Sequence, residues 1–308
     1  MIKKIVITGW MLTVFTLAAF TQTEADFTVE LTKDNTGAVI TRYIGSTTQV
    51  RIPVTIQGMP VKEIGDRAFS GNSTVTSVGI PQGVIIIGYE AFRNASKLTS
   101  VTLPEGIIKI GDDAFRNCSL TAITLPKSLI YLGTSAFCNT NITAISLPAN
   151  LRFREGMHII YGHRAFGNCT QLASVIISEG ITEIPYSMFS GCTALTSITF
   201  PSTLTTIGGE AFSGNTALAS ISLPSSITTI ESFAFSGCTT LTSISLPSSI
   251  TTIGGGAFYG CAVLTNVTIP NSVEKINFSG LSDAFQGCSK IPLTTQALLK
   301  RLGYTGRF

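Results

Sequence analysis

Leu218–Ile230 reads LASISLPSSITTI and Leu241–Ile253 reads LTSISLPSSITTI, so two segments 23 residues apart differ at one position in thirteen. Similar segments recur along most of the 308 residues, and each is followed by a phenylalanine that comes after alanine or, once, after methionine. A fixed period of this length predicts a repeat architecture. The phenylalanines are 23 residues apart except for intervals of 22, 29 and 27, and they are Phe69, Phe92, Phe115, Phe137, Phe166, Phe189, Phe212, Phe235, Phe258 and Phe285.

Each repeat has the pattern L-x-x-I-x-L-P-x-x-I-x-x-I-G-x-x-A-F-x-G/N, and each part of it predicts a local structure. The alternating start predicts a short strand with Ile221 and Leu223 inside, and the proline that follows ends the strand because it donates no backbone hydrogen bond. The I-x-x-I-G-x-x-A-F part predicts a short helical turn over the core. Glycine or asparagine stands two residues after the phenylalanine in every copy, which predicts a left-handed residue that closes the turn.

A single repeat cannot bury its own apolar face, but stacked repeats share one continuous core. Stacking would align the strands into a parallel sheet and the phenylalanines into a spine. The segments LTSVTLPEGIIKIGDDAFRNC (Leu98–Cys118) and IPVTIQGMPVKEIGDRAFSGN (Ile52–Asn72) resemble the repeats of BspA-like leucine-rich repeat proteins, and the resemblance covers roughly residues 50–290. It implies an α/β fold, a curved leucine-rich-repeat solenoid with the parallel sheet on its concave face and short helical turns on its convex face.

The two ends depart from the repeat, so the chain is predicted to have four parts. Residues 1–25 combine two lysines, an apolar run and a polar end, which is the layout of a secretory signal peptide; a membrane anchor is the alternative, but the run is short for a span. Residues 26–57 are predicted to form a β-hairpin cap, and residues 58–292 the solenoid of about ten 23-residue units. Residues 293–308 are predicted to cap the other end with a helix over Thr294–Leu302, for which Thr294 is a candidate helix cap.

The composition argues against several classes of function. Charged residues make up only 12% of the chain and the net charge is +3, so there is no basic footprint for nucleic acid. The two histidines, His158 and His163, leave little room for a histidine-dependent catalytic site, and with Glu155 they match no spacing typical of zinc. No G-x-S-x-G motif occurs. We therefore expect no catalytic site, no metal, no cofactor and no membrane span in the mature chain.

The cysteines follow the repeat, with one exception. Cys138 directly follows Phe137, outside the common register, and it is therefore predicted to be the exposed thiol that labels fastest. The others stand three residues after the phenylalanine, which predicts a buried row of structural thiols, with bridges between neighbouring repeats left open by the distance. These six are Cys118, Cys169, Cys192, Cys238, Cys261 and Cys288.

The outward strand positions are candidate binding positions, since none of the 27 in the nine full repeats is charged and most are serine or threonine. Such a face lacks the aromatic and arginine anchors of tight interfaces, so its binding should be broad and modest; short hydroxyl residues also simply suit an exposed sheet. The candidate partner-binding residues of the sheet are Ser100, Thr102, Thr124, Ser197, Thr199, Ser220, Ser222, Ser243 and Ser245. The 29-residue repeat carries an insertion, either a binding loop or a tolerated one, which adds Arg152, Arg154, His158, Tyr161 and His163.

The resemblance implies an exported, non-enzymatic interaction protein that is secreted, periplasmic or on the bacterial cell surface. Its expected partners are host extracellular-matrix proteins, such as fibronectin or fibrinogen, or other cells. The alternative is a self-assembling structural envelope protein, a homo-oligomer whose concave face meets another copy of itself. The two hypotheses differ in whether the size of the protein in solution depends on its concentration without any partner.

Overall fold

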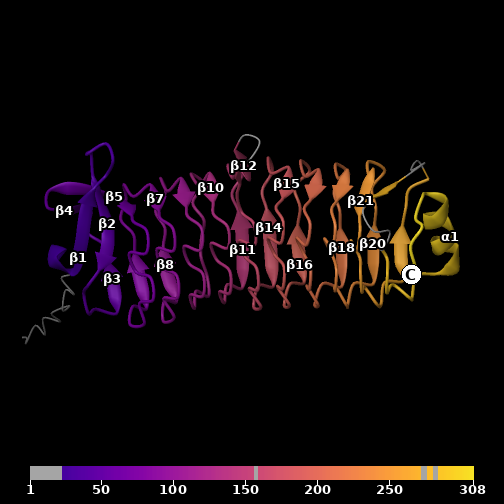
Figure 1. Cartoon of the computed structure of the whole chain (residues 1–308), viewed down its shortest axis with the longest axis horizontal. Helices are drawn as coiled ribbons and strands as arrows, with labels where there is room; N and C mark the ends of the chain where they lie inside the picture. Colours follow the sequence, from indigo (N-terminus) through magenta and orange to yellow (C-terminus); the bar gives the residue numbers. More distant parts are fainter. Residues whose placement is uncertain (1–22, 156–158, 272–275, 280–283) are drawn as a thin grey trace, which may run out of the picture.

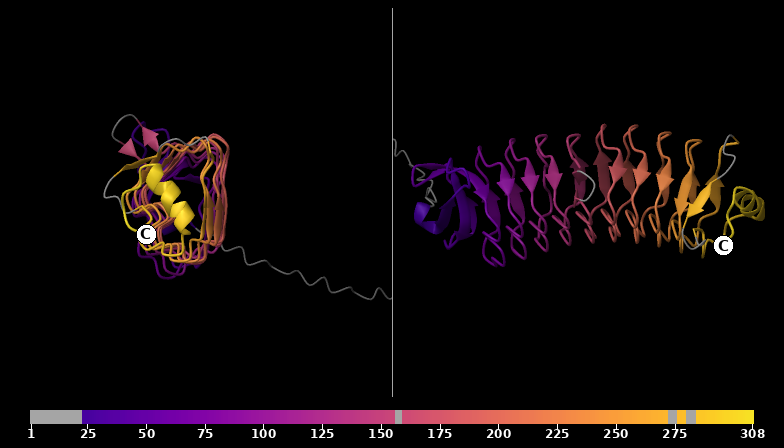
Figure 2. Two further views of the ribbon diagram at one scale, coloured as in Figure 1. Left: turned by 90° about the vertical axis from the view of Figure 1, so that its right-hand side faces the viewer. Right: turned by 45° about the horizontal axis from the view of Figure 1, so that its top comes forward.

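The computed structural model describes residues 23–155, 159–271, 276–279 and 284–308. These residues form an elongated solenoid of stacked coils, with a β-hairpin at the N-terminal end and a helix at the C-terminal end (Figure 1). Seen along its axis in Figure 2, the successive coils superimpose around one interior. Most of the predicted signal peptide lies outside the described residues, and its last residues enter the short 3-10 turn η1 (Glu24–Asp26).

The start of each repeat contributes to a row of parallel strands, which we call the first strand row (the lower arrows of Figure 1). Its strands pair in register, with Ile221 opposite Ile244 and Ser222 opposite Ser245, so like residues stack on like. The row consists of three sheets: β3 (Gln49–Arg51), β6 (Ser77–Gly79) and β8 (Ser100–Thr102); β11 (Ala144–Leu147), β14 (Ser174–Ile177) and β16 (Ser197–Thr199); and β18 (Ser220–Ser222), β20 (Ser243–Ser245) and β22 (Asn266–Thr268).

The I-x-x-I-G segments form a second strand row (the upper arrows of Figure 1) instead of entering helical turns. Their parallel pairing again places equivalent residues of successive repeats opposite each other. One sheet starts with the N-terminal hairpin and contains β1 (Phe27–Leu31), β2 (Ala38–Tyr43), β5 (Met59–Ile64), β7 (Ile86–Ile87), β9 (Lys109–Ile110) and β10 (Tyr131–Leu132), with β4 (Thr55–Ile56) paired to β5. The other contains β15 (Glu183–Ile184), β17 (Thr206–Ile207), β19 (Thr229–Ile230), β21 (Thr252–Gly254) and β23 (Asn277–Ser279).

The prediction of helical turns before each phenylalanine is wrong, and the backbone explains why. The residue two positions before the phenylalanine is left-handed, with φ of 59° at Arg67 and at Phe233, and a right-handed helix does not continue through such a residue. The amides that follow alternate between bonds inside the turn and bonds to the next coil. The amide of Ala68 donates to the Gly65 carbonyl, whereas that of Phe69 donates to the Ala91 carbonyl.

The predicted left-handed residue two positions after the phenylalanine is present in all ten repeats. Its φ ranges from 57° at Asn168 to 82° at Gly287. Each repeat therefore has two left-handed residues, one on either side of the phenylalanine. Together they turn the chain sharply around the buried ring.

The predicted phenylalanine spine is confirmed, since the ten rings form one continuous stack. Neighbouring ring centroids lie 4.8–5.6 Å apart and their planes are within 17° of each other. Tyr43 stacks on Phe69 at one end, and Tyr304 meets Phe285 edge-on at the other. Each ring is at most 2% exposed, and burial of one such side chain contributes about 1.5–3 kcal/mol, so the stack is a main source of stability.

Both ends of the core are covered. At the N-terminal end, β1 and β2 form an antiparallel hairpin whose Tyr43 begins the aromatic stack. At the other end, α1 (Leu293–Arg301) buries Leu299, and the carbonyl of Leu302 accepts a hydrogen bond from the Ile276 amide (3.0 Å). The helix begins one residue before the predicted start with Pro292 at its N-cap, so Thr294 does not cap it.

Candidate binding surfaces

The serine and threonine residues predicted to bind a partner lie on the first strand row. Eight of the nine are on β8, β16, β18 and β20, while Thr124 lies between β8 and β11 where residues 121–126 form no strand. All nine are exposed except Ser243, which is half-buried. None of their hydroxyls hydrogen-bonds to another described residue, so they face solvent. The row places them on one uncharged surface, and their contact with a partner stays a prediction.

The position just before these strands differs, because its hydroxyl is used inside the molecule. Thr99 donates to the Thr76 carbonyl (3.2 Å) and Thr242 to the Ala219 carbonyl (3.1 Å), in each case 23 residues earlier. Thr251 does the same from the second strand row. These bonds tie one coil to the one before it. The sequence analysis counted Thr99 and Thr242 as outward positions, but their hydroxyls serve the fold.

The long repeat forms a small hairpin beside the solenoid. β12 (Arg154–Glu155) pairs antiparallel with β13 (Ile159–Ile160), and Figure 1 shows β12 at the upper margin of the coils. His158 lies outside the described residues, as does the side chain of Arg154. The insertion is therefore placed by its backbone, next to the second strand row.

The other predicted residues of the insertion are spread over two contacts. Arg152 is exposed and lines a hollow of about 220 Å³ that Glu183 also lines. Tyr161 and His163 are half-buried: Tyr161 lies against Tyr131 with ring centroids 5.1 Å apart, and His163 is 5.8 Å from the ring of its neighbour in the next repeat. These contacts hold the base of the insertion on the second strand row.

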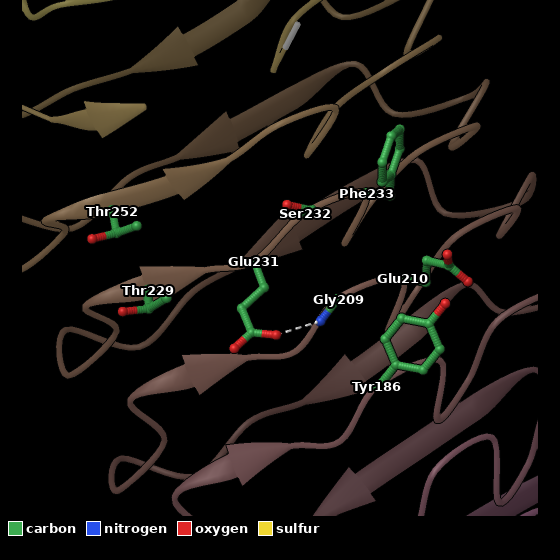
Figure 3. A pocket seen from close by; sticks show the side chains of 8 residues that line it. All are labelled: Tyr186, Gly209, Glu210, Thr229, Glu231, Ser232, Phe233 and Thr252. Carbon is green, nitrogen blue, oxygen red and sulfur yellow. Dashed lines mark hydrogen bonds between the residues drawn. The ribbon is translucent and has the colours of Figure 1, made fainter. Parts of the chain in front are cut away.

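Sequence reasoning missed a larger hollow on the second strand row, with a volume of about 430 Å³ (Figure 3). Glu231 accepts a hydrogen bond from the amide of Gly209 (2.9 Å), and Tyr186 donates one to Glu210, which raises the pKa of the tyrosine. Two signals could have found it: exposed aromatic residues at repeat positions that are otherwise small or polar, and the absence of lysine and arginine from residues 165–274. It is lined by Tyr186, Gly209, Glu210, Thr229, Glu231, Ser232, Phe233 and Thr252.

The N-terminal repeats carry an ion network at the same repeat positions. Arg67 donates through Nε to Glu90 (2.7 Å), Arg93 forms a second ion pair with Glu90, and Arg116 pairs with Asp113. The hydrogen bond from Arg67 is the main reason why the pKa of Glu90 falls from its ordinary 4.5 to about 2. Glu90 is therefore ionised at any physiological pH, and these repeats neutralise their own carboxylates.

The predicted row of structural thiols is buried, and all seven cysteines are free. Cys118 donates to the carbonyl of Phe92 (3.0 Å) and Cys238 to that of Phe212 (3.3 Å), each in the preceding coil. Burial raises the pKa of Cys118 to about 12. The thiols therefore act as hydrogen-bond donors of the core rather than as nucleophiles.

The prediction that Cys138 is exposed is wrong, since its side chain is buried and only 1% of the residue is accessible. The next repeat has Gly167 at the equivalent position, and the side chain of Arg164 lies over that glycine in the space where a side chain would stand. Arg164 and Arg116 lie close to the Cys138 thiol, but burial outweighs them and raises its pKa. The departure from the repeat register thus marks a covered thiol.

Two searches of the described part of the chain gave no site. Residues 23–155, 159–271, 276–279 and 284–308 hold no group of three or more histidine, cysteine, aspartate or glutamate residues able to bind a metal ion. Over the same ranges, no helix combines the length and apolar character that crossing a membrane requires.

Comparisons with known proteins agree with the repeat. The chain matches the family described as BspA type leucine rich repeat region, with six copies over residues 62–156 and 159–292. These ranges cover well over half of the chain. A search of curated proteins gives no match.

Several solved structures are similar along most of the chain. A leucine-rich repeat protein from Bacteroides ovatus is 24% identical with a TM-score of 0.51, and the match covers 91% of this chain and 97% of that one. A leucine rich cell surface protein from Faecalibacterium prausnitzii is 26% identical (TM-score 0.41; 93% and 98% covered). A pneumococcal vaccine antigen is 21% identical (TM-score 0.49; 80% and 70% covered). The first of these likenesses supports the solenoid fold.

Proposed function

The chain belongs to the family of BspA-type leucine-rich repeat proteins, and on that premise we propose that it is an exported, non-enzymatic scaffold that binds other proteins. A repeat solenoid of this family is suited to protein interaction because it presents a long continuous surface. The finer proposal is that the protein is an adhesin for host extracellular-matrix proteins such as fibronectin or fibrinogen. Residues 1–25 would direct export, and residues 26–57 and 293–308 would cap the solenoid of residues 58–292.

One observation carries this proposal: the uncharged hydroxyl surface of the first strand row. Ser220, Ser222, Ser243 and Ser245 form a grid on neighbouring strands, and their hydroxyls have no partner among the described residues. Hydroxyls without a partner can donate to or accept from an extended polypeptide that lies across the strands. The absence of charge means that no partner is rejected by like-charge repulsion, so the surface tolerates a range of protein sequences.

The same surface sets a limit on affinity. It has no aromatic or arginine anchor of the kind that dominates tight interfaces, so each contact is weak. A large matrix protein that repeats its binding segment can compensate through several contacts at once, because the second contact becomes intramolecular. We therefore propose modest monovalent binding and stronger binding to a dense surface of the partner.

Biolayer interferometry of the full chain tests the proposal on sensors that carry fibronectin, fibrinogen, the protein itself or albumin. We expect saturable binding to at least one matrix protein above albumin, with an apparent affinity that increases with the density of the matrix protein on the sensor. A variant whose insertion, residues 151–164, is shortened to the common repeat length separates a contribution of the insertion from that of the strand surface. Circular dichroism of this variant checks that it folds.

Three outcomes would contradict the proposal or redirect it. Binding to the self-coated sensor alone, with a size in solution that increases with concentration, favours the self-assembling envelope protein. Binding to albumin as strong as to the matrix proteins shows that the surface is merely adhesive. Absence of binding on every sensor rejects the adhesin.

A further inference from the structure

The hollow on the second strand row is the strongest unexplained feature of the molecule (Figure 3). It lies over β19 and β21 and the turns that follow the strands, on a row other than the one that carries the proposed hydroxyl surface. Two aromatic rings and two carboxylates contribute to its lining: Tyr186, Phe233, Glu210 and Glu231. The rings are 46% and 45% exposed, so nothing in the described chain covers them.

Glycines of the neighbouring coil make room for both rings. A Cβ atom at Gly209 would stand 3.2 Å from the ring of Tyr186, and a Cβ atom at Gly256 would overlap the ring of Phe233. Any larger residue at these two positions would displace the rings. The aromatic walls of the hollow are therefore fixed by the backbones beneath them, and the ring faces remain available to a ligand.

The two carboxylates receive hydrogen bonds only from neutral donors. Glu210 accepts from the hydroxyl of Ser187 (2.9 Å) and from Tyr186, whose hydroxyl points at it in Figure 3, and Glu231 accepts from the Gly209 amide. Among the described residues, no lysine or arginine forms an ion pair with either of them. Residues 165–274 contain no lysine or arginine at all, so this part of the solenoid does not supply a cation of its own.

The N-terminal repeats show what these residue types bind when an internal cation is present. The guanidinium of Arg67 lies 5.4 Å from the centroid of the Tyr89 ring and donates to the carboxylate of Glu90 (2.7 Å). Tyr89 and Tyr186 stand three residues before a repeat phenylalanine, and Glu90 and Glu210 stand two residues before one. In the hollow, the carboxylate comes from the coil after the tyrosine, and the cation is missing.

We propose that the hollow binds the guanidinium group of an arginine on a basic, extended segment of a partner protein. A planar guanidinium can stack on an aromatic face and donate to carboxylates at the same time, which an ammonium group does less well. Tyr186 and Phe233 provide the faces, and Glu210 and Glu231 accept the hydrogen bonds. The inference rests on the proposed binding function and adds a second surface with a defined ligand chemistry.

The experiment uses the full chain and a fluorescent peptide, Gly-Arg-Gly-Arg-Gly, in an anisotropy titration at low ionic strength. The citrulline peptide of the same length keeps the shape of arginine without its charge, and the lysine peptide keeps the charge without the planar group. The double variant Glu210→Gln and Glu231→Gln removes both carboxylate charges, and Phe233→Leu removes one ring. The matched control is Glu179→Gln, an exposed glutamate of the same stretch that does not line the hollow and is held by Ser202.

We expect saturable binding of the arginine peptide, and at least about fivefold weaker binding to the double glutamine variant, as loss of exposed ion pairs implies. Phe233→Leu should weaken binding about twofold to fivefold, the range of an exposed cation–π contact. Glu179→Gln should stay within about twofold of the unchanged chain. The lysine peptide should bind more weakly than the arginine peptide, and the citrulline peptide should not bind.

The inference is overturned if the arginine peptide does not bind, if the citrulline or lysine peptide binds equally well, or if Glu179→Gln weakens binding as much as the double variant. Its failure is distinguishable from failure of the proposed function. Binding to a matrix protein without binding to the arginine peptide rejects only the hollow. Binding to the arginine peptide without binding to any matrix protein rejects the adhesin and leaves the hollow in place.

Discussion

Gly111→Ala tests the close stacking of the coils. Gly65, Gly88, Gly111 and Gly133 stand at equivalent positions of four consecutive repeats, and each contacts the backbone of the coil before it. A Cβ atom at Gly111 would lie 2.7–2.8 Å from the backbone atoms of Gly88 and Tyr89. Pro185 and Glu231 occupy this position in later repeats, so the prediction concerns the run of consecutive glycines, where backbone lies directly on backbone.

The magnitude follows from two opposing effects. Forcing an extra carbon into a filled contact costs about 1–3 kcal/mol, and replacing glycine returns about 0.4–1 kcal/mol by restricting the unfolded chain. The free energy of unfolding should therefore fall by about 1–2 kcal/mol. With an m-value of about 3 kcal/mol per molar urea for a chain of this size, the urea midpoint should fall by about 0.3–0.7 M.

Gly79→Ala is the matched control, because a Cβ atom there would meet nothing closer than 3.8 Å and the backbone does not require glycine. Its urea midpoint, followed by circular dichroism, should stay equal or rise. The two substitutions are chemically identical, so opposite directions isolate the contact between coils. An unchanged or raised midpoint for Gly111→Ala would refute the reasoning that glycine sets the distance between coils.

Three further predictions concern the core and the ion network. Phe212→Ala should lower the free energy of unfolding by about 3–5 kcal/mol in a urea titration, because the ring is fully buried in the stack; a loss below about 1 kcal/mol would contradict its role. In the folded protein, Cys138 should react with a thiol reagent as slowly as Cys118, since both are buried, and a fast single thiol would refute its placement. The pKa of Glu90 is lowered from 4.5 to about 2, so its stabilising effect is complete above about pH 4.5 and is lost as the pH falls towards 2; the difference in urea midpoint between the unchanged chain and Glu90→Gln should shrink over that range, and a constant difference would contradict the ion network.

The spine and the register of the fold could be predicted from the sequence because they depend on residue types that recur at a fixed period. Phenylalanine, and the glycine or asparagine two residues later, are the side chains that a buried ring and a left-handed turn require. The same reasoning placed six thiols in the core. Like residues therefore stack on like, and the period alone sets the contacts between coils.

The second strand row could not be predicted because its signal is in the backbone. Arg67, Asp113 and Phe233 adopt a left-handed conformation that their side chains do not favour, and no residue type marks it. A spacing of three to five apolar residues then resembles a helix, although the chain makes a two-residue strand and a turn. Hydrogen bonds to the next coil decide between the two, and they depend on residues about 23 positions away.

The candidate surfaces divide in the same way. The exposed serines of the first strand row follow from alternation along a strand, which the sequence displays. The burial of Cys138 depends instead on Arg164, 26 residues later, whose side chain lies over Gly167. The hollow likewise needs Tyr186 and the carboxylate of a following coil, a pairing that the sequence of a single repeat does not reveal.

The most direct test of the proposed function is a comparison of two double variants on the matrix protein that binds the unchanged chain best. Ser222→Lys with Ser245→Lys places two charges on the hydroxyl surface, whereas Ser225→Lys with Ser248→Lys places the same charges on exposed serines of the same repeats outside the strands. Biolayer interferometry should show at least about tenfold weaker binding for the first pair, about 1.4 kcal/mol, and unchanged binding for the second. Equal binding by both variants would contradict the assignment of partner binding to the first strand row.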